Sequence, residues 1–239
     1  MTKDVCVPDT TVDKLDSADE DVLPSMIVFD LDDCLWTPEM HELYGMPSKP
    51  IRGNLNPDEE DDSSRHGRHQ PKRTAKRKNV NESNSDAEIG VVGMNVPNGQ
   101  TVYLYDGARR ALREIATNPR FKRVLIGVAS TSLEPSYSRH CINNIEIIPG
   151  LTMRDLIDYD EIGRTGHLTS RKTTHFKSLH EKSGVPYEEM VFYDDCNWGD
   201  HCQDLEDTYR VVGQRTPNGL QIEEFYAGLQ KYAKLCKKR

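Results

Sequence analysis

The sequence predicts an α/β protein built on a doubly wound, mostly parallel sheet. Three short apolar runs suit buried strands, namely Met26–Phe29, Val124–Ala129 and Glu189–Tyr193, and helical stretches separate them. Two of these runs stop directly on acidic residues, at the strand ends where open parallel sheets bind their ligands. Because the segments between the strands are long enough to hold crossover helices, we expect helices on both faces of the sheet.

Local patterns predict the elements between the first two buried strands. The turn sequence Pro97-Asn98-Gly99 separates Val91–Met94 from Thr101–Leu104, which predicts a β-hairpin. Asp106 is expected to cap a helix that ends near Asn118. The sequence from Trp36 to about Ile51 contains several prolines and is expected to be irregular.

The second half of the chain alternates helices and strands. Lys172–Ser183 is predicted to be a helix that stops at Gly184. The remaining expectations are a helix up to about Asn144, strands at Ile145–Ile148, 158–164 and Tyr209–Val212, a helix over 198–206, and a last amphipathic helix that starts near Ile222.

Composition divides the chain into folded and unfolded parts. Only 36% of the 239 residues are hydrophobic, which indicates that part of the chain does not pack into a core. We expect residues 1–23 to be a disordered acidic tail and residues 24–239 to form one domain. A charged low-complexity insertion over 52–90 interrupts that domain. Its basic cluster, Lys72–Lys78, fits a nuclear address, an anion-binding patch or a solvated charge run.

Charge and cysteine content limit the partners. A net charge of −8 argues against nucleic acid, and no apolar run reaches the roughly 20 residues that a membrane span needs. Six scattered cysteines without a Cys-x-x-Cys pair favour reduced thiols. We therefore expect a cytoplasmic monomer, or a nuclear one if the basic cluster is an address, with no nucleic-acid or membrane partner.

The acidic strand ends carry the functional signal. Asp30 and Asp32 follow the first strand, and Asp194 and Asp195 follow a later one. Parallel strands end at the same edge of a sheet, so these acids can converge, and a hard divalent cation such as Mg²⁺ would neutralise them. Lys172 and the metal would attract a phosphate, to which the Ser130 hydroxyl could donate a hydrogen bond. One carboxylate could then attack phosphorus while another moves protons.

These residues also carry a resemblance to a known family. The stretch Phe29-Asp30-Leu31-Asp32-Asp33-Cys34-Leu35-Trp36 resembles the first motif of the haloacid dehalogenase-like (HAD) phosphatases, and within them the magnesium-dependent phosphatases. The other matching pieces follow in order: Ala129-Ser130, Lys172-x-Thr174-His175-Phe176, Gly184-Val185-Pro186, and Met190 to Asn197. The resemblance implies a HAD-like Rossmannoid fold without a cap domain, with the hairpin as a flap beside an open site.

The resemblance also implies a role for each matching residue. Asp30 would be the nucleophile and a Mg²⁺ ligand, and Asp32 the general acid and base, with its backbone carbonyl on the metal. The remaining roles are metal binding by Asp194 with Asp195 beside it, charge balance and substrate binding by Lys172, and substrate binding by Ser130 and Thr131. The implied substrates are phosphotyrosine in proteins, other phosphoproteins or small sugar phosphates.

Two positions depart from the family pattern. Cys34 stands where the family usually has threonine, and Thr131 stands where we would expect arginine. Both departures leave the substrate open, and they motivate one alternative, a non-catalytic binding or scaffold protein of the same fold. A second alternative is a phosphotransferase, because sequence does not separate transfer to another acceptor from hydrolysis. Zinc binding by Cys196, His201 and Cys202 is disfavoured because their spacing matches no common zinc site.

Overall fold

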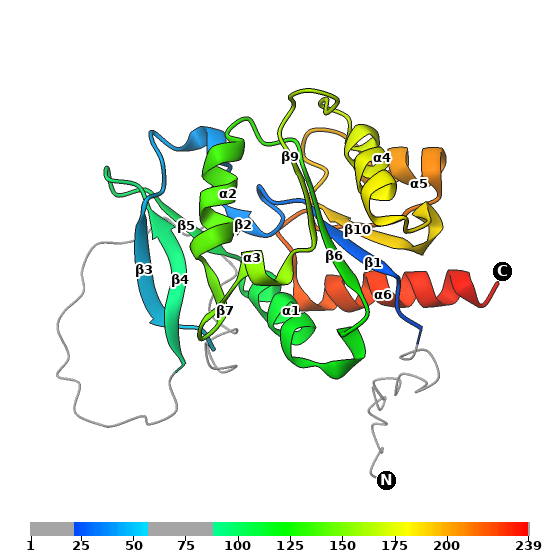
Figure 1. Ribbon diagram of the computed structural model, residues 1–239, viewed down its shortest axis with the longest axis horizontal. Helices are drawn as coiled ribbons and strands as arrows, with labels where there is room; N and C mark the ends of the chain where they lie inside the picture. Colours follow the sequence, from blue (N-terminus) through cyan, green and yellow to red (C-terminus); the bar gives the residue numbers. More distant parts are fainter. Residues whose placement is uncertain (1–21, 57–87, 239) are drawn as a thin grey trace, which may run out of the picture.

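The computed structural model describes residues 22–56 and 88–238 (Figure 1). Its centre is a five-stranded sheet, and every strand pair in it is parallel. In spatial order its strands are β11 (Val212–Arg215), β10 (Met190–Asp194), β1 (Met26–Phe29), β6 (Leu125–Ser130) and β9 (Tyr159–Ile162). The predicted fold class is confirmed.

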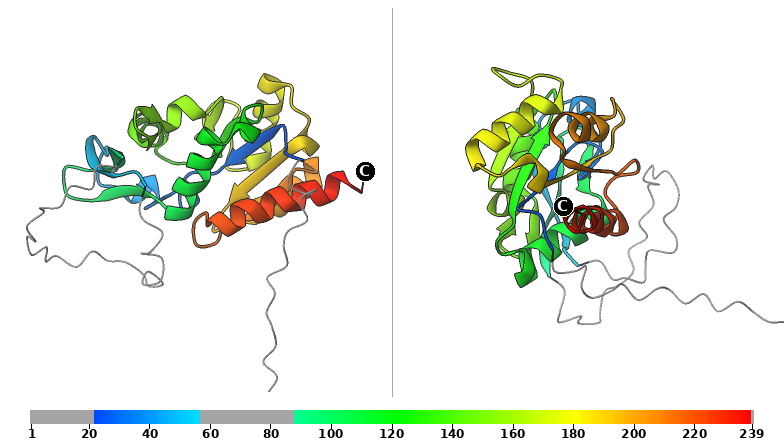
Figure 2. Two further views of the ribbon diagram at one scale, coloured as in Figure 1. Left: turned by 90° about the horizontal axis from the view of Figure 1, so that it is seen from below. Right: turned by 90° about the vertical axis from the view of Figure 1, so that its right-hand side faces the viewer.

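Alternate residues of β1 pack into two different hydrophobic clusters, one on each face of the sheet. Met26 and Val28 pack with side chains of α4 (Lys172–Ser183) and α5 (His201–Tyr209). On the other face, Ile27 and Phe29 pack with α1 (Asp106–Thr117) and α6 (Ile222–Cys236). Figure 2 shows the helices on both sides of the sheet. A strand buried on both faces needs the unbroken apolar run that the sequence has here.

The predicted hairpin belongs to a larger antiparallel sheet. β4 (Ile89–Asn95) and β5 (Thr101–Leu104) form the hairpin, as predicted. β3 (Lys49–Asn54) pairs with β4 on one side, and β2 (Trp36–Thr37) pairs with β5 on the other. The expectation of an irregular run up to Ile51 is therefore wrong for β2 and β3.

The described fold also reaches into both ends of the segment expected to be an insertion. Residues 52–54 continue β3, and residues 89–90 begin β4. The rest of that segment, residues 57–87 with the basic cluster, lies outside the described residues, as do residues 1–21 of the expected tail. Val22 and Leu23, assigned to the tail, pack partly buried against the core.

The antiparallel sheet shares the core of the parallel one. Met94, Val102 and Leu104 are buried in the same cluster as Ile27 and Phe29. Across residues 22–56 and 88–238, the second sheet is thus an attachment to the first rather than a domain with its own core. None of the helices in these ranges has the length and apolar character needed to cross a membrane.

The connection from β6 to β9 and three short 3₁₀ helices complete the described chain. The connection contains α2 (Pro135–Asn144), α3 (Met153–Leu156) and an antiparallel pair, β7 (Glu146–Ile148) with β8 (Leu151–Thr152). The 3₁₀ helices are Met40–Glu42, Pro119–Phe121 and Tyr187–Glu189.

Three helix boundaries test the predicted capping and turn signals. Gly184 ends α4 with φ 72°, as predicted. Asp106 is the first helical residue of α1 rather than its cap, which is Tyr105. The helix expected over 198–206 instead runs from His201 to Tyr209. Asp200 caps its start by accepting from the Gln203 amide, and Arg210 ends it in the left-handed region with φ 62°. The last strand accordingly starts at Val212 and not at Tyr209.

Candidate active site

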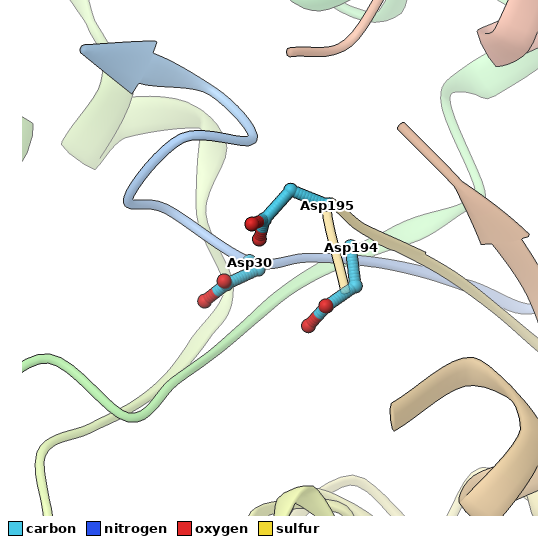
Figure 3. A group of neighbouring side chains, drawn as sticks. All are labelled: Asp30, Asp194 and Asp195. Carbon is cyan, nitrogen blue, oxygen red and sulfur yellow. The ribbon is translucent and has the colours of Figure 1, made fainter. Parts of the chain in front are cut away.

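Three carboxylates meet at the carboxyl edge of the parallel sheet. Asp30 directly follows β1, Asp194 is the last residue of β10, and Asp195 comes next. The Asp30 amide donates to the Tyr193 carbonyl at 2.9 Å, which keeps the two strand ends together. Figure 3 shows the three side chains gathered at this edge, and one ligand oxygen from each lies within 4.8 Å of the others. All three residues are buried.

Lys172, the first residue of α4, supplies positive charge to this cluster. Its Nζ lies 2.6 Å from Asp30 Oδ1 and 3.1 Å from Asp194 Oδ2, and it donates to the Ala129 carbonyl at 2.8 Å. Burial lowers the pKa of the ammonium, but Asp194 and Asp30 outweigh this effect and raise the pKa above its usual value. The lysine is therefore a fixed cation between two strand ends.

The cluster keeps more negative charge than Lys172 balances. Burial raises the pKa of Asp30, and it raises the pKa of Asp195 to about 7 with help from the charge of Asp30. Burial also acts to raise the pKa of Asp194, but Lys172 and His201 outweigh it and hold the pKa below its usual range. Three clustered carboxylate oxygens are the hard donors that Mg²⁺ prefers, so the residues fit this cation.

Asp32 stands apart from the three-carboxylate cluster. Its Oδ1 accepts a hydrogen bond from Trp36 Nε1 at 2.8 Å, and it lines the same pocket as Asp30. Burial raises the pKa of Asp32 to about 7, against the opposing effect of the Trp36 bond. The chain reaches this geometry by a tight turn in which Asp33 has φ 54°. Asp32 can therefore hold or release a proton near neutral pH.

Ser130 and Thr131 lie at the end of β6, where the site was predicted to hold phosphate. Ser130 is buried, and its Oγ accepts from the Ser132 amide at 3.3 Å. Both residues line a pocket of about 200 Å³ with Asp30, Asp32 and Asp195. The other lining residues are Glu39, His41, Ser132, Leu133, Arg164, Trp198 and His201. Asp30, Asp32, Ser130 and Thr131 thus line one pocket. Lys172 does not line it but contacts the Asp30 carboxylate.

Sequence reasoning missed several neighbours of the cluster. His201 Nδ1 lies 3.3 Å from both carboxylate oxygens of Asp194, a role that its position at the start of α5 did not reveal. His175, to which the sequence gave no role, is buried with Nε2 3.1 Å from the Ser130 carbonyl. The first contact spans only seven residues but depends on the turn between β10 and α5, whereas the second joins segments 45 residues apart. Only a Lys-x-x-His spacing on α4 hinted at the second.

Cys34 does not face the pocket. Its side chain is fully buried, Sγ donates to the Tyr193 carbonyl at 3.5 Å, and Thr216 Oγ1 donates to Sγ at 3.5 Å. The thiol thus links the acidic loop to β10 where the family has a hydroxyl. Burial, with the charge of Asp30, raises its pKa well above the usual value.

Comparison with known protein families identifies the family of the chain. The family model for Acid Phosphatase matches residues 22–72 and 74–235. The chain belongs to this family. It is accordingly a member of the HAD superfamily of phosphatases, as the sequence motifs indicated.

Two curated proteins are similar over part of the chain. A HAD-like hydrolase superfamily protein of Schizosaccharomyces pombe is 28% identical over 97 residues, which is 41% of this chain and 53% of that protein. The human magnesium-dependent phosphatase 1 is 31% identical over 65 residues, 26% of this chain and 34% of the human protein. The chain thus aligns with about half of the first relative's length and a third of the second's.

Two solved structures are also similar at low sequence identity. The N-terminal part of a Bacteroides fragilis protein that contains a phosphatase domain, complexed with Mg, covers 85% of this chain and 39% of its own, with 12% identity and a TM-score of 0.49. The match to CbbY from Rhodobacter sphaeroides in complex with phosphate covers 81% of this chain and 87% of CbbY, with 14% identity and a TM-score of 0.40.

Proposed function

We propose that the protein is a Mg²⁺-dependent phosphomonoester hydrolase that works through an aspartyl-phosphate on Asp30. The observation that carries this proposal is the buried cluster of Asp30, Asp194 and Asp195 with Lys172 in contact with two of them. Membership of a phosphatase family supports the reaction class. Mg²⁺ held by Asp30, Asp194 and the Asp32 carbonyl, with Asp195 beside it, would neutralise charge on the carboxylates and the phosphate.

The residues divide the reaction into two steps. In the first, an Asp30 carboxylate oxygen forms a bond to phosphorus, and the bond to the leaving oxygen breaks as Asp32 protonates that oxygen. In the second, Asp32 takes a proton from water, which attacks phosphorus and frees Asp30 with release of phosphate. Lys172 balances the charge on Asp30 in both steps, and Ser130 donates a hydrogen bond to a phosphoryl oxygen.

The rim of the pocket suits an aromatic leaving group. Trp198 and Leu133 line the pocket although they are 75% and 57% exposed. Glu39 Oε1 accepts a hydrogen bond from Trp198 Nε1 at 2.8 Å, which holds the indole at the mouth. An exposed indole can stack against a phenyl ring. We therefore place phosphotyrosine ahead of sugar phosphates as the substrate class.

The test is phosphate release from 4-nitrophenyl phosphate, with Mg²⁺ and with excess chelator. Wild-type protein should turn over only with Mg²⁺, and Asp30→Asn should lose turnover because a carboxamide is a far weaker nucleophile. Asp33→Asn is the matched control: Asp33 carries the same side chain in the same turn without lining the pocket, and asparagine tolerates its φ of 54°. Folded wild-type protein with no turnover would contradict the proposal and favour a binding protein.

A further inference from the structure

Arg164 brings a guanidinium to the wall of the pocket where β6 ends. It lies in the loop between β9 and α4, and its Nε donates to the Thr131 carbonyl at 2.9 Å. Arg164 lines the same pocket as Asp30 and Ser130, although it is far from both in sequence. Its side chain is exposed, so the guanidinium faces the opening rather than the core.

The backbone beside Arg164 is fixed to the end of β6. The Gly163 amide donates to the Ser130 carbonyl at 2.8 Å. His175 Nε2 lies 3.1 Å from the Ser130 carbonyl and 3.0 Å from the Gly163 carbonyl, so one buried ring joins both segments. Gly163 has φ 105°, a conformation that side chains rarely adopt. The position of Arg164 relative to Ser130 is therefore set by several contacts.

The charges around Arg164 leave its guanidinium available to a ligand. Among the described residues that line the pocket, it is the only lysine or arginine, whereas Asp32, Glu39 and Asp195 make the mouth acidic. Within residues 22–56 and 88–238, no carboxylate lies within ion-pair distance of it. The Nε–Thr131 bond leaves the two Nη groups for an anion, and guanidinium binds carboxylates in a two-pronged geometry.

We propose that Arg164 binds a second anionic group of the substrate, namely an acidic side chain next to the phosphorylated tyrosine. This inference rests on the proposed function and adds a specificity determinant to it. The proposed function already gives the reacting phosphate its own partners, since Lys172 contacts the Asp30 carboxylate and Ser130 lines the pocket with Asp30. The exposed Arg164 stands at the rim, where flanking residues of a peptide would pass.

The experiment compares two phosphotyrosine peptides that differ only in having glutamate or glutamine on both sides of the phosphotyrosine. Steady-state KM and kcat are measured for wild type, Arg164→Gln and Arg171→Gln. Glutamine at 164 keeps a donor for the Thr131 carbonyl but removes the charge. Arg171 is the control because it lies in the same loop, is exposed, and does not line the pocket.

We expect the wild type to have a lower KM for the glutamate peptide, and Arg164→Gln to raise that KM about tenfold. The same variant should leave kcat and the KM for the glutamine peptide unchanged, and Arg171→Gln should match the wild type. Restoring a guanidinium with Thr131→Arg in the Arg164→Gln background should recover part of the preference, because Thr131 lines the same wall.

Two results would overturn the inference and leave the proposed function standing. One is a wild-type enzyme that hydrolyses 4-nitrophenyl phosphate but does not distinguish the peptides. The other is an Arg164→Gln variant that changes both peptides and 4-nitrophenyl phosphate equally, which would place the guanidinium on the reacting phosphate. If the wild type released no phosphate from any of these substrates with Mg²⁺, the proposed function itself would fail.

Discussion

Replacing Lys172 with methionine tests whether the buried cluster has the charge balance that we describe. Methionine has a similar length but no charge, so the change leaves Asp30 and Asp194 without the ammonium that lies 2.6 and 3.1 Å from them. Breaking a buried ion pair by removing one partner costs about 3–5 kcal/mol. Because burial already raises the pKa of Asp30, protonation of this carboxyl limits the penalty. We therefore expect a loss near the lower end of that range, about 3 kcal/mol.

The assay is urea unfolding at neutral pH, in chelator and in saturating Mg²⁺. Lys177→Met is the matched control, because Lys177 lies on the same helix with its side chain 65% exposed and 3.9 Å from Glu181. An exposed pair of this kind contributes about 0.3–0.5 kcal/mol. Mg²⁺ should reduce the difference in unfolding free energy between Lys172→Met and wild type. The variant's cluster is more negative and therefore binds the cation more tightly than the wild-type cluster does.

Two results would refute this reasoning. If Lys172→Met lost as little unfolding free energy in chelator as Lys177→Met does, Lys172 would not be a desolvated partner of the carboxylates. A loss of the same size with and without Mg²⁺ would mean that the cation does not bind at this cluster.

Three further predictions follow from single contacts. Cys34 should resist alkylation in the native protein and react after unfolding, because the thiol is buried and its pKa is raised. Peptide mass spectrometry measures the labelling, and alkylation of Cys34 in the native protein as fast as that of an exposed thiol would contradict this prediction. Gly184→Ala should cost about 1 kcal/mol in urea unfolding because φ is 72° there, with turnover unchanged; an unchanged midpoint would mean that the cap relaxes. A pH–rate profile should show kcat/KM falling above about pH 7, because Asp32 must be protonated to act as an acid and its pKa is raised to about 7. Asp32→Asn should lower the rate and remove that limb, and a rate that rises through this range would contradict the assignment.

Most of the parallel sheet and the acidic cluster follow from sequence because both depend on local pattern. The run Met26–Phe29 is apolar at every position, which only a strand with both faces covered requires. Once β1 and β10 are parallel neighbours, their ends must meet, so Asp30 and Asp194 converge without any further information. Lys172 was identifiable in the same way, because it opens a helix that follows a strand of that sheet.

Two kinds of feature escaped prediction: those fixed by pairing with a distant segment, and local conformations that the residue type does not signal. β3 reads Lys-Pro-Ile-Arg-Gly-Asn, in which Ile51 is the only large apolar residue and no residue is fully buried, and it is a strand because β4 pairs with it. The C-terminal limit of α5 depends on Arg210 adopting a left-handed conformation, which favours glycine or asparagine and gives no signal at an arginine. His201 and Arg164 reach the site from loops and helix ends, and no spacing along the chain specifies those positions.

The most direct test of the central claim is to look for phosphate on Asp30. Protein should be mixed with 4-nitrophenyl phosphate and Mg²⁺, quenched in acid within the first turnover, and digested for mass spectrometry. Asp32→Asn should be run beside the wild type. The weakly basic 4-nitrophenolate leaves with little need of an acid, whereas water still needs the base, so the covalent intermediate accumulates. We expect a phosphoryl group on the peptide that contains Asp30, more of it in Asp32→Asn, and none in Asp30→Asn. Phosphate release by the wild type with no phosphorylated Asp30 in either protein would contradict the mechanism.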